Sequence, residues 1–83
     1  MTTYLIPEYD SRKNFYKKAI VKENEKEIVL YSYNTKVAII DKISNSCKVT
    51  GTYSNTTLRH IKEFLHQNNF PCGSKQEIIR MYM

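Results

Sequence analysis

The hydrophobic pattern changes its period once along the chain, at about residue 54, and this change constrains the fold more than any other feature. Before it, apolar and polar residues tend to alternate, as in a strand with one buried face. After it, Leu58, Ile61 and Leu65 recur at the spacing of one helix face. Strands followed by helices predict an α+β domain. With 83 residues, the chain has room for a single domain, residues 1–83.

Four strands are expected within residues 14–53. Four segments are apolar, β-branched or alternating: Phe15–Glu23, Glu27–Tyr33, Lys36–Asp41 and Cys47–Tyr53. Three polar segments between them favour turns: residues 24–26, 34–35 and 44–46. The prediction is a four-stranded antiparallel meander. Residues 1–11 contain Pro7 and predict an extended arm that packs over the domain.

Two helices are expected after the sheet, over residues 55–69 and 74–82. Ser54 or Asn55 can cap the first, and its apolar stripe predicts that it covers one face of the sheet. Ser74 and Glu77 have the spacing of a capping box, which predicts a short second helix. A helix of about two turns is stable only when it is docked.

Enzymatic and cofactor sites find little support in the composition. Gly51 and Gly73 are the only glycines, too few for a phosphate-binding loop. The two cysteines are 25 residues apart without a Cys-x-x-Cys motif, and the two histidines do not share one helix face. We therefore predict reduced thiols, two surface histidines, no metal, no cofactor and no enzymatic activity. The sequence lacks a signal peptide and a long apolar run, which predicts a cytoplasmic protein that does not enter a membrane.

Basic residues outnumber acidic ones by 13 to 8, which favours an acidic partner. Five of them fall in residues 12–22, a segment without any acid. If that segment is a strand, four residues share its outer face, where lysines could follow a phosphate backbone and a tyrosine could stack: Arg12, Tyr16, Lys18 and Lys22. The alternative is a charged outer strand that only prevents edge pairing.

Two other surfaces are candidate binding sites. On the first helix, Arg59, Lys62 and His66 form a basic stripe that could contact phosphates or an acidic protein. The alternative there is a solvated flank with Glu63 balancing the charge. The remaining candidates are strand tyrosines next to lysines, which either serve an interface or pack across strands: Tyr31, Tyr33 and Tyr53, flanked by Lys36 and Lys48.

Three motifs, YDSRK from Tyr9, SYNTKVA from Ser32 and TTxRHIKEFL from Thr56, carry a family resemblance. They resemble small uncharacterised proteins of Gram-positive bacteria with AT-rich genomes and of their phages. The resemblance implies a mobile-element setting, in which short basic proteins often inhibit host defence, as anti-CRISPR proteins do. The architecture is also loosely similar to the DNA arm-binding domains of phage integrases.

Together these features predict a non-enzymatic phage or mobile-element protein that inhibits a host defence nucleoprotein complex. The alternative is a small basic DNA- or RNA-binding module that acts directly on nucleic acid. The expected partner is accordingly a host protein or nucleoprotein complex, or nucleic acid itself. An exposed edge strand or the second helix would also allow a homodimer.

Overall fold

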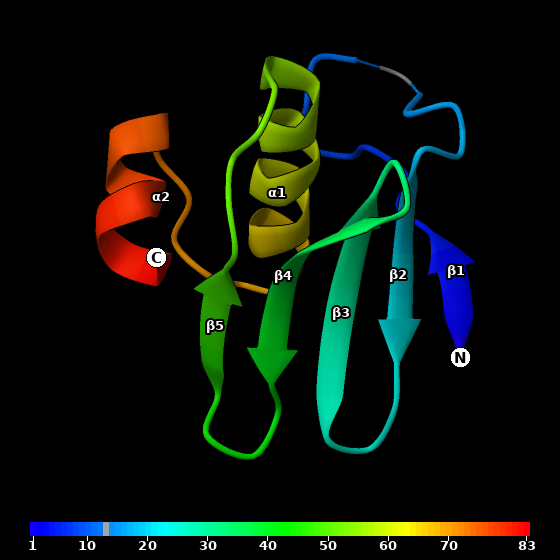
Figure 1. The fold of residues 1–83 in the computed structure, drawn as a ribbon. Helices are drawn as coiled ribbons and strands as arrows, with labels where there is room; N and C mark the ends of the chain where they lie inside the picture. The colour runs from blue at the N-terminus through cyan, green and yellow to red at the C-terminus, as the bar shows by residue number, and fades with distance from the viewer. Residues whose placement is uncertain (13) are drawn as a thin grey trace.

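The structure is a computed structural model that describes residues 1–12 and 14–83. It contains a five-stranded antiparallel sheet, followed by two helices (Figure 1). The strands pair in chain order: β1 (Thr2–Tyr4), β2 (Ala19–Glu23), β3 (Glu27–Ser32), β4 (Thr35–Asp41) and β5 (Ser46–Val49). The α+β class and the meander are confirmed, and the number of strands is five rather than four. Lys13, part of the predicted basic run, lies outside the described residues.

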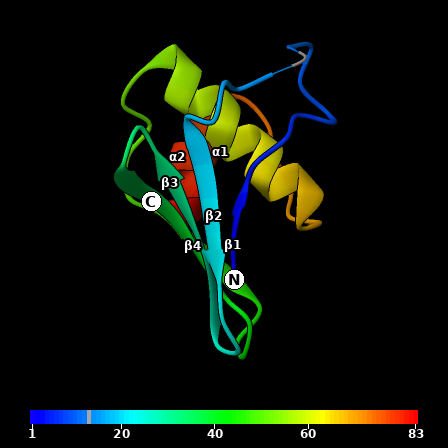
Figure 2. The same cartoon turned by 90° about the vertical axis from the view of Figure 1, so that its right-hand side faces the viewer.

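The additional strand, β1, comes from the segment predicted as an arm. It pairs antiparallel with β2, with Thr3 opposite Val21. All three of its residues are exposed, so it has no buried face and no alternation that could reveal it in the sequence. Of the predicted arm, residues 1–11, only residues 5–11 lie outside a strand. Leu5 still donates a hydrogen bond to Ala19 O and is buried in the core, and the residues after it run beside α1 (Figure 2).

The first predicted strand begins four residues later than expected, because residues 15–18 form a turn. Lys18 N donates to Phe15 O at 2.9 Å, and Tyr16 and Lys17 have φ angles of 52° and 62°. This turn places the Phe15 side chain in the core, where it is 4% exposed. The predicted common strand face is therefore wrong for Arg12, Tyr16 and Lys18, which precede β2, and only Lys22 lies on that strand.

Two strand boundaries also differ from the prediction. The turn between β3 and β4 consists of Tyr33 and Asn34, with φ angles of 51° and 67°, instead of residues 34–35. Both angles fit the two-residue turns whose twist matches antiparallel strands. β5 ends at Val49, and the next residues leave the sheet to reach the cap of α1.

Both helices form where the capping residues predict them. α1 (Asn55–Gln67) has Ser54 as its N-cap, whose side chain accepts a hydrogen bond from Thr57 N. α2 (Lys75–Tyr82) begins with the complete capping box of Ser74 and Glu77. Among the described residues, no helix is long and apolar enough to cross a membrane.

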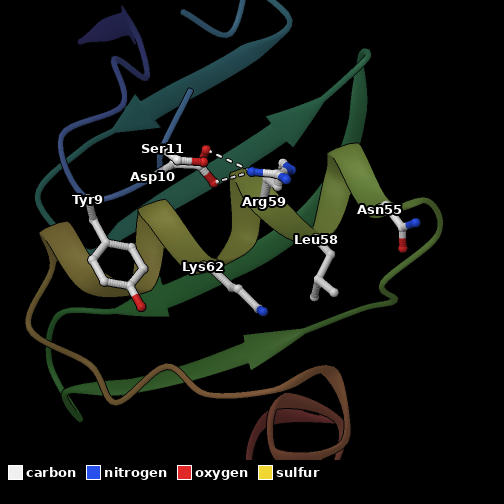
Figure 3. Close-up of a pocket in the computed structure, with 7 residues that line it drawn as sticks. All are labelled: Tyr9, Asp10, Ser11, Asn55, Leu58, Arg59 and Lys62. Carbon is white, nitrogen blue, oxygen red and sulfur yellow. Dashed lines mark hydrogen bonds and ion pairs between the residues drawn. The ribbon is translucent and has the colours of Figure 1, made fainter. Parts of the chain in front are cut away.

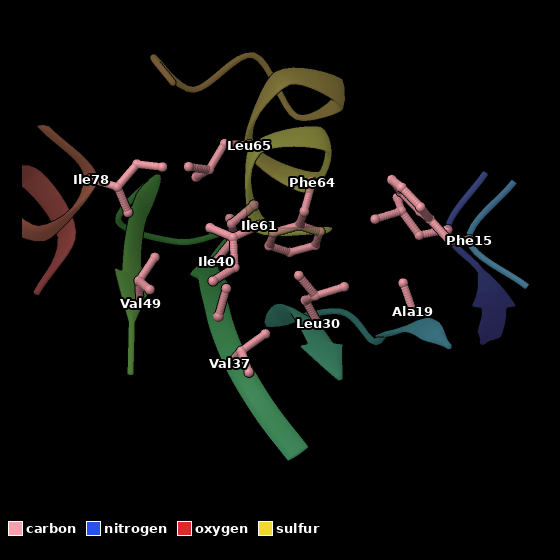
Figure 4. Packing of buried hydrophobic residues seen from close by; sticks show 12 residues of the cluster. Phe15, Ala19, Leu30, Val37, Ile40, Val49, Ile61, Phe64, Leu65 and Ile78 are labelled. Atoms are coloured by element: carbon pink, nitrogen blue, oxygen red, sulfur yellow. The ribbon is translucent and has the colours of Figure 1, made fainter. Parts of the chain in front are cut away.

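One hydrophobic cluster joins both helices to a single face of the sheet. Phe64 and Leu65 of α1 and Ile78 of α2 are fully buried in it, together with Leu30 and Val49 of the sheet (Figure 4). Because side chains alternate along a strand, the neighbours of Leu30 point to the opposite face. That opposite face, called the open face below, lies outside the cluster and carries apolar, tyrosine and lysine side chains: Ile20, Lys22, Val29, Tyr31 and Ile39.

Candidate binding surfaces

The predicted basic stripe of α1 is largely occupied by the N-terminal arm. Arg59 Nη1 donates to both carboxylate oxygens of Asp10, at 3.0 and 3.3 Å. The ring of His66 stacks on that of Tyr9, with centroids 4.2 Å apart. Of the three predicted residues, only Lys62 makes neither an ion pair nor an aromatic stack with the described part of the chain. The positive charge available to a partner on this helix is therefore small.

Glu63 anchors the arm to α1. Its carboxylate is fully buried and accepts hydrogen bonds from Tyr9 N at 3.0 Å, Asp10 N at 2.7 Å and Gln67 Nε2 at 2.7 Å. Burial alone would raise the pKa of Glu63, but these hydrogen bonds outweigh it and lower the pKa below its ordinary value. The view of Glu63 as a solvated partner for surface charges is wrong, because a buried carboxylate is tolerated when donors surround it.

A hollow with a volume of about 470 Å³ lies between the arm and α1. Arm residues Tyr9 to Ser11 form one wall, and Leu58, Arg59 and Lys62 contribute to the other (Figure 3). The ion pair between Asp10 and Arg59 crosses it. Since Asp10 neutralises Arg59, Lys62 is the one remaining cation among the described residues that line the hollow, which makes it a weak candidate for a phosphate site.

His60 is buried instead of exposed, so the prediction of two surface histidines is wrong for this residue. Its Nδ1 atom lies 2.8 Å from Ser32 Oγ, while Nε2 has no hydrogen-bond partner among the described residues. The ring packs edge-on against Phe15 and is stacked on Tyr33. Burial lowers the pKa of His60, which favours a neutral ring. This side chain connects α1 to the β3–β4 turn and does not face solvent.

The open face combines tyrosine rings with lysine ammonium groups. Lys22 Nζ lies 5.1 Å from the ring centroid of Tyr31, and Lys17 Nζ lies 5.5 Å from that of Tyr4. Ile20 pairs with both tyrosines across the strands, which brings them to the same face. Such pairs hold the ammonium over the ring while leaving it able to contact a phosphate.

Charge is distributed unevenly between the two ends of the sheet. Glu23, Glu27 and Asp41 lie at the end where β2 and β4 finish, together with Lys26, Lys42 and the N-terminal ammonium group of Met1. Acids and bases are mixed at that end. The opposite end, called the basic end below, is formed by residues 16–18 and 33–36. It contains Lys17, Lys18 and Lys36 without any acidic residue. A polyanion would therefore meet least repulsion at this end.

Tyrosines at the basic end adopt a backbone conformation that their residue type disfavours. Tyr16 and Tyr33 have φ angles of 52° and 51°, in the left-handed region where Asn and Gly are preferred. Each such residue costs on the order of 1 kcal/mol. The Tyr16 side chain is 73% exposed, so burial contributes little to offset this cost, whereas Tyr33 is 51% exposed and one side of its ring stacks on His60. A role on the surface would explain why tyrosine occupies position 16.

The other predicted residues are more scattered. Arg12 is exposed directly after the arm, and Tyr53 is 62% exposed in the segment between β5 and α1. The structure thus brings Lys18 and Tyr33 together with Tyr16 at the basic end, and Lys22 with Tyr31 on the open face. Arg59 and His66 lie against the arm, and Lys62 lies beside it.

Comparison with known proteins yields one finding. Residues 4–80 match the sequence pattern of a family described as a family of unknown function (DUF8033). Neither the curated proteins nor the solved structures contain a match to this chain. Among residues 1–12 and 14–83, no cluster of three His, Cys, Asp or Glu side chains is placed to hold a metal ion.

Proposed function

The chain belongs to this family of unknown function, and we propose that it is a non-enzymatic binding protein of the phage inhibitor type, which docks on a host defence nucleoprotein complex. The observation that carries the proposal is the basic end, where exposed tyrosines and lysines lie together while the acids of the sheet lie at the other end. Tyrosine and lysine in this arrangement suit an acidic or phosphate-bearing surface.

The groups that the fold buries support a binding role over catalysis. Glu63 uses its carboxylate to hold the arm, and His60 uses Nδ1 to bond Ser32. Both side chains are fully buried, so neither is placed to exchange a proton with a bound molecule. The exposed residues of the basic end, in contrast, include rings and ammonium groups suited to recognition.

Capture from a bacterial host lysate, with and without nuclease, tests the proposal. The double variant Lys18→Glu with Lys22→Glu should lose the captured complex, because it reverses two charges beside the tyrosines. Lys26→Glu with Lys75→Glu is the matched control, since both residues are exposed elsewhere and the change in net charge is equal. Capture that both double variants reduce equally, or no specific capture at all, would refute the proposed docking surface.

The second candidate is a small DNA- or RNA-binding module that acts directly on nucleic acid. The lysine–tyrosine pairs of the open face favour it, because a base can stack on the same ring whose neighbouring lysine contacts a phosphate. Complete loss of the captured complex on nuclease treatment, together with binding of the purified protein to nucleic acid, would favour this candidate over the inhibitor.

A further inference from the structure

Two neighbouring hollows lie at the basic end. One, with a volume of about 410 Å³, is lined by Tyr4, Leu5, Ile6, Asn14, Tyr16 and Lys17. The other, of about 330 Å³, is lined by Lys17, Lys18, Ile20, Tyr33 and Asn34. Lys17 borders both, so the hollows adjoin each other and share one ammonium group.

Each hollow contains the two groups that a nucleotide requires. Tyr4 and Tyr16 in the first and Tyr33 in the second are all at least half exposed, at 50%, 73% and 51%. Their rings provide surfaces on which bases can stack. Lys17 and Lys18 provide positive charge for the phosphates, and the described residues that line the two hollows include no acidic side chain.

This arrangement discriminates between kinds of polyanion. In a duplex, each base is stacked between its neighbours, so tyrosines in hollows cannot reach its faces, and only the lysines would contribute. An acidic protein surface would engage the ammonium groups, but its carboxylates offer no flat ring to stack on the tyrosines. A strand with unstacked bases supplies both partners, a base for each ring and a phosphate for each lysine.

We propose that the basic end binds single-stranded nucleic acid, with successive bases in the two hollows and the intervening phosphate near Lys17. This inference deepens the proposed function, on which it rests, by naming the part of the nucleoprotein target that the protein contacts. Asn or Gly at Tyr16 and Tyr33 would relieve the disfavoured backbone conformation but would remove the ring.

Fluorescence anisotropy with labelled single-stranded DNA and RNA 12-mers, and with a DNA duplex of the same length, tests the inference. We expect the single strands to bind more tightly than the duplex. Tyr16→Asn and Tyr33→Asn should each weaken single-strand binding by about 5- to 150-fold, the range for loss of one stacked base. Asn is chosen because it tolerates a positive φ, so both variants should fold.

Tyr53→Asn is the matched control. Tyr53 is 62% exposed and has a φ of 51°, yet it borders neither hollow. Its replacement should leave binding unchanged. An equal loss in the Tyr53→Asn variant, duplex binding as tight as that of the single strand, or no binding to either single strand would each overturn the inference.

The outcomes separate this inference from the proposed function. If a host complex is captured through Lys18 and Lys22 while the 12-mers do not bind, the inference fails and the proposed function stands. If the 12-mers bind through the tyrosines but no host complex is captured, the inference holds within the alternative function of a direct nucleic-acid module. If the wild-type protein neither captures a host complex nor binds the 12-mers, both the proposed function and the inference are refuted.

Discussion

Replacing Glu63 by Gln should destabilise the protein by about 2 kcal/mol. The carboxylate accepts three hydrogen bonds, from Tyr9 N, Asp10 N and Gln67 Nε2. Hydrogen bonds to a charged acceptor contribute about 1.5–3 kcal/mol each. Gln retains only one acceptor oxygen and places an NH₂ group opposite backbone donors, which destabilises the variant. It also removes a buried charge, and the desolvation cost that is no longer incurred offsets part of the loss. The freed backbone donors of the arm can also turn to water, which limits the total.

The loss should depend on pH in a defined direction. The pKa of Glu63 is lowered in the folded protein, so its ionised form contributes stability at pH values above the unfolded pKa near 4.5. That contribution disappears as the pH falls through the lower, folded pKa. The wild-type protein should therefore lose stability below about pH 4.5 more steeply than the Glu63→Gln variant, and the two stability curves should converge in acid.

Urea and thermal unfolding followed by circular dichroism measure the effect. For a domain of this size, about 2 kcal/mol corresponds to a decrease in Tm of about 8–16 °C. Glu8→Gln is the control, because Glu8 is exposed and its side chain accepts no hydrogen bond among the described residues. Amide exchange at Tyr9 and Asp10 should accelerate in the Glu63→Gln variant only. If both variants unfold within about 0.5 kcal/mol of each other, Glu63 does not anchor the arm.

Four further predictions concern the rest of the chain. Burial raises the pKa of Cys47 to about 11, from the ordinary value of 9.0, so iodoacetamide should alkylate it about 100-fold more slowly than an unperturbed thiol. Equal alkylation rates in the native and urea-unfolded protein, measured by peptide mass spectrometry, would contradict this. Ser74→Ala should cost about 1 kcal/mol in urea unfolding through loss of the α2 cap, and an unchanged midpoint would show that docking alone holds the helix. Ser32→Ala should cost about 1–3 kcal/mol, because His60 Nδ1 loses its buried partner, and a loss below about 0.5 kcal/mol would mean that water or Thr57 replaces it. Tyr16→Asn should stabilise the protein by about 0.5–1 kcal/mol while it weakens binding, and a lower Tm would show that the ring supports the fold.

Features that depend on neighbouring residues were predictable from the sequence. The starts of both helices follow from their caps, the capping box of Ser74 and Glu77 and the N-cap Ser54. In each cap a side chain bonds to a backbone group only three residues away, so the local sequence is sufficient to predict it. The meander followed in the same way from hydrophobic segments separated by short polar turns. In contrast, β1 has no buried face, and only its pairing with β2 makes it a strand.

The errors at the candidate site have one physical origin, which is competition between local pattern and distant contacts. Alternation through residues 15–23 indicated a strand, but burial of Phe15 against His60 requires a turn before Ala19. The role of Glu63 depends on donors more than 50 residues away in the sequence, and no spacing rule connects them. Tyr33 and Lys18 were identified individually, while their grouping at one end of the sheet emerges only from the strand register.

The separation of charge along the sheet also governs how the molecule approaches a polyanion. Its principal extents are 31 × 30 × 21 Å, and the screening length is about 30 Å in 0.01 M salt but only about 8 Å in 0.15 M salt. In dilute salt, the attraction of the basic end acts across the whole protein and turns it before contact, because the acids and bases of the opposite end largely offset each other. At physiological ionic strength the polyanion attracts only charges within about 8 Å of it. Productive encounters then begin mainly with the basic end already facing the polyanion.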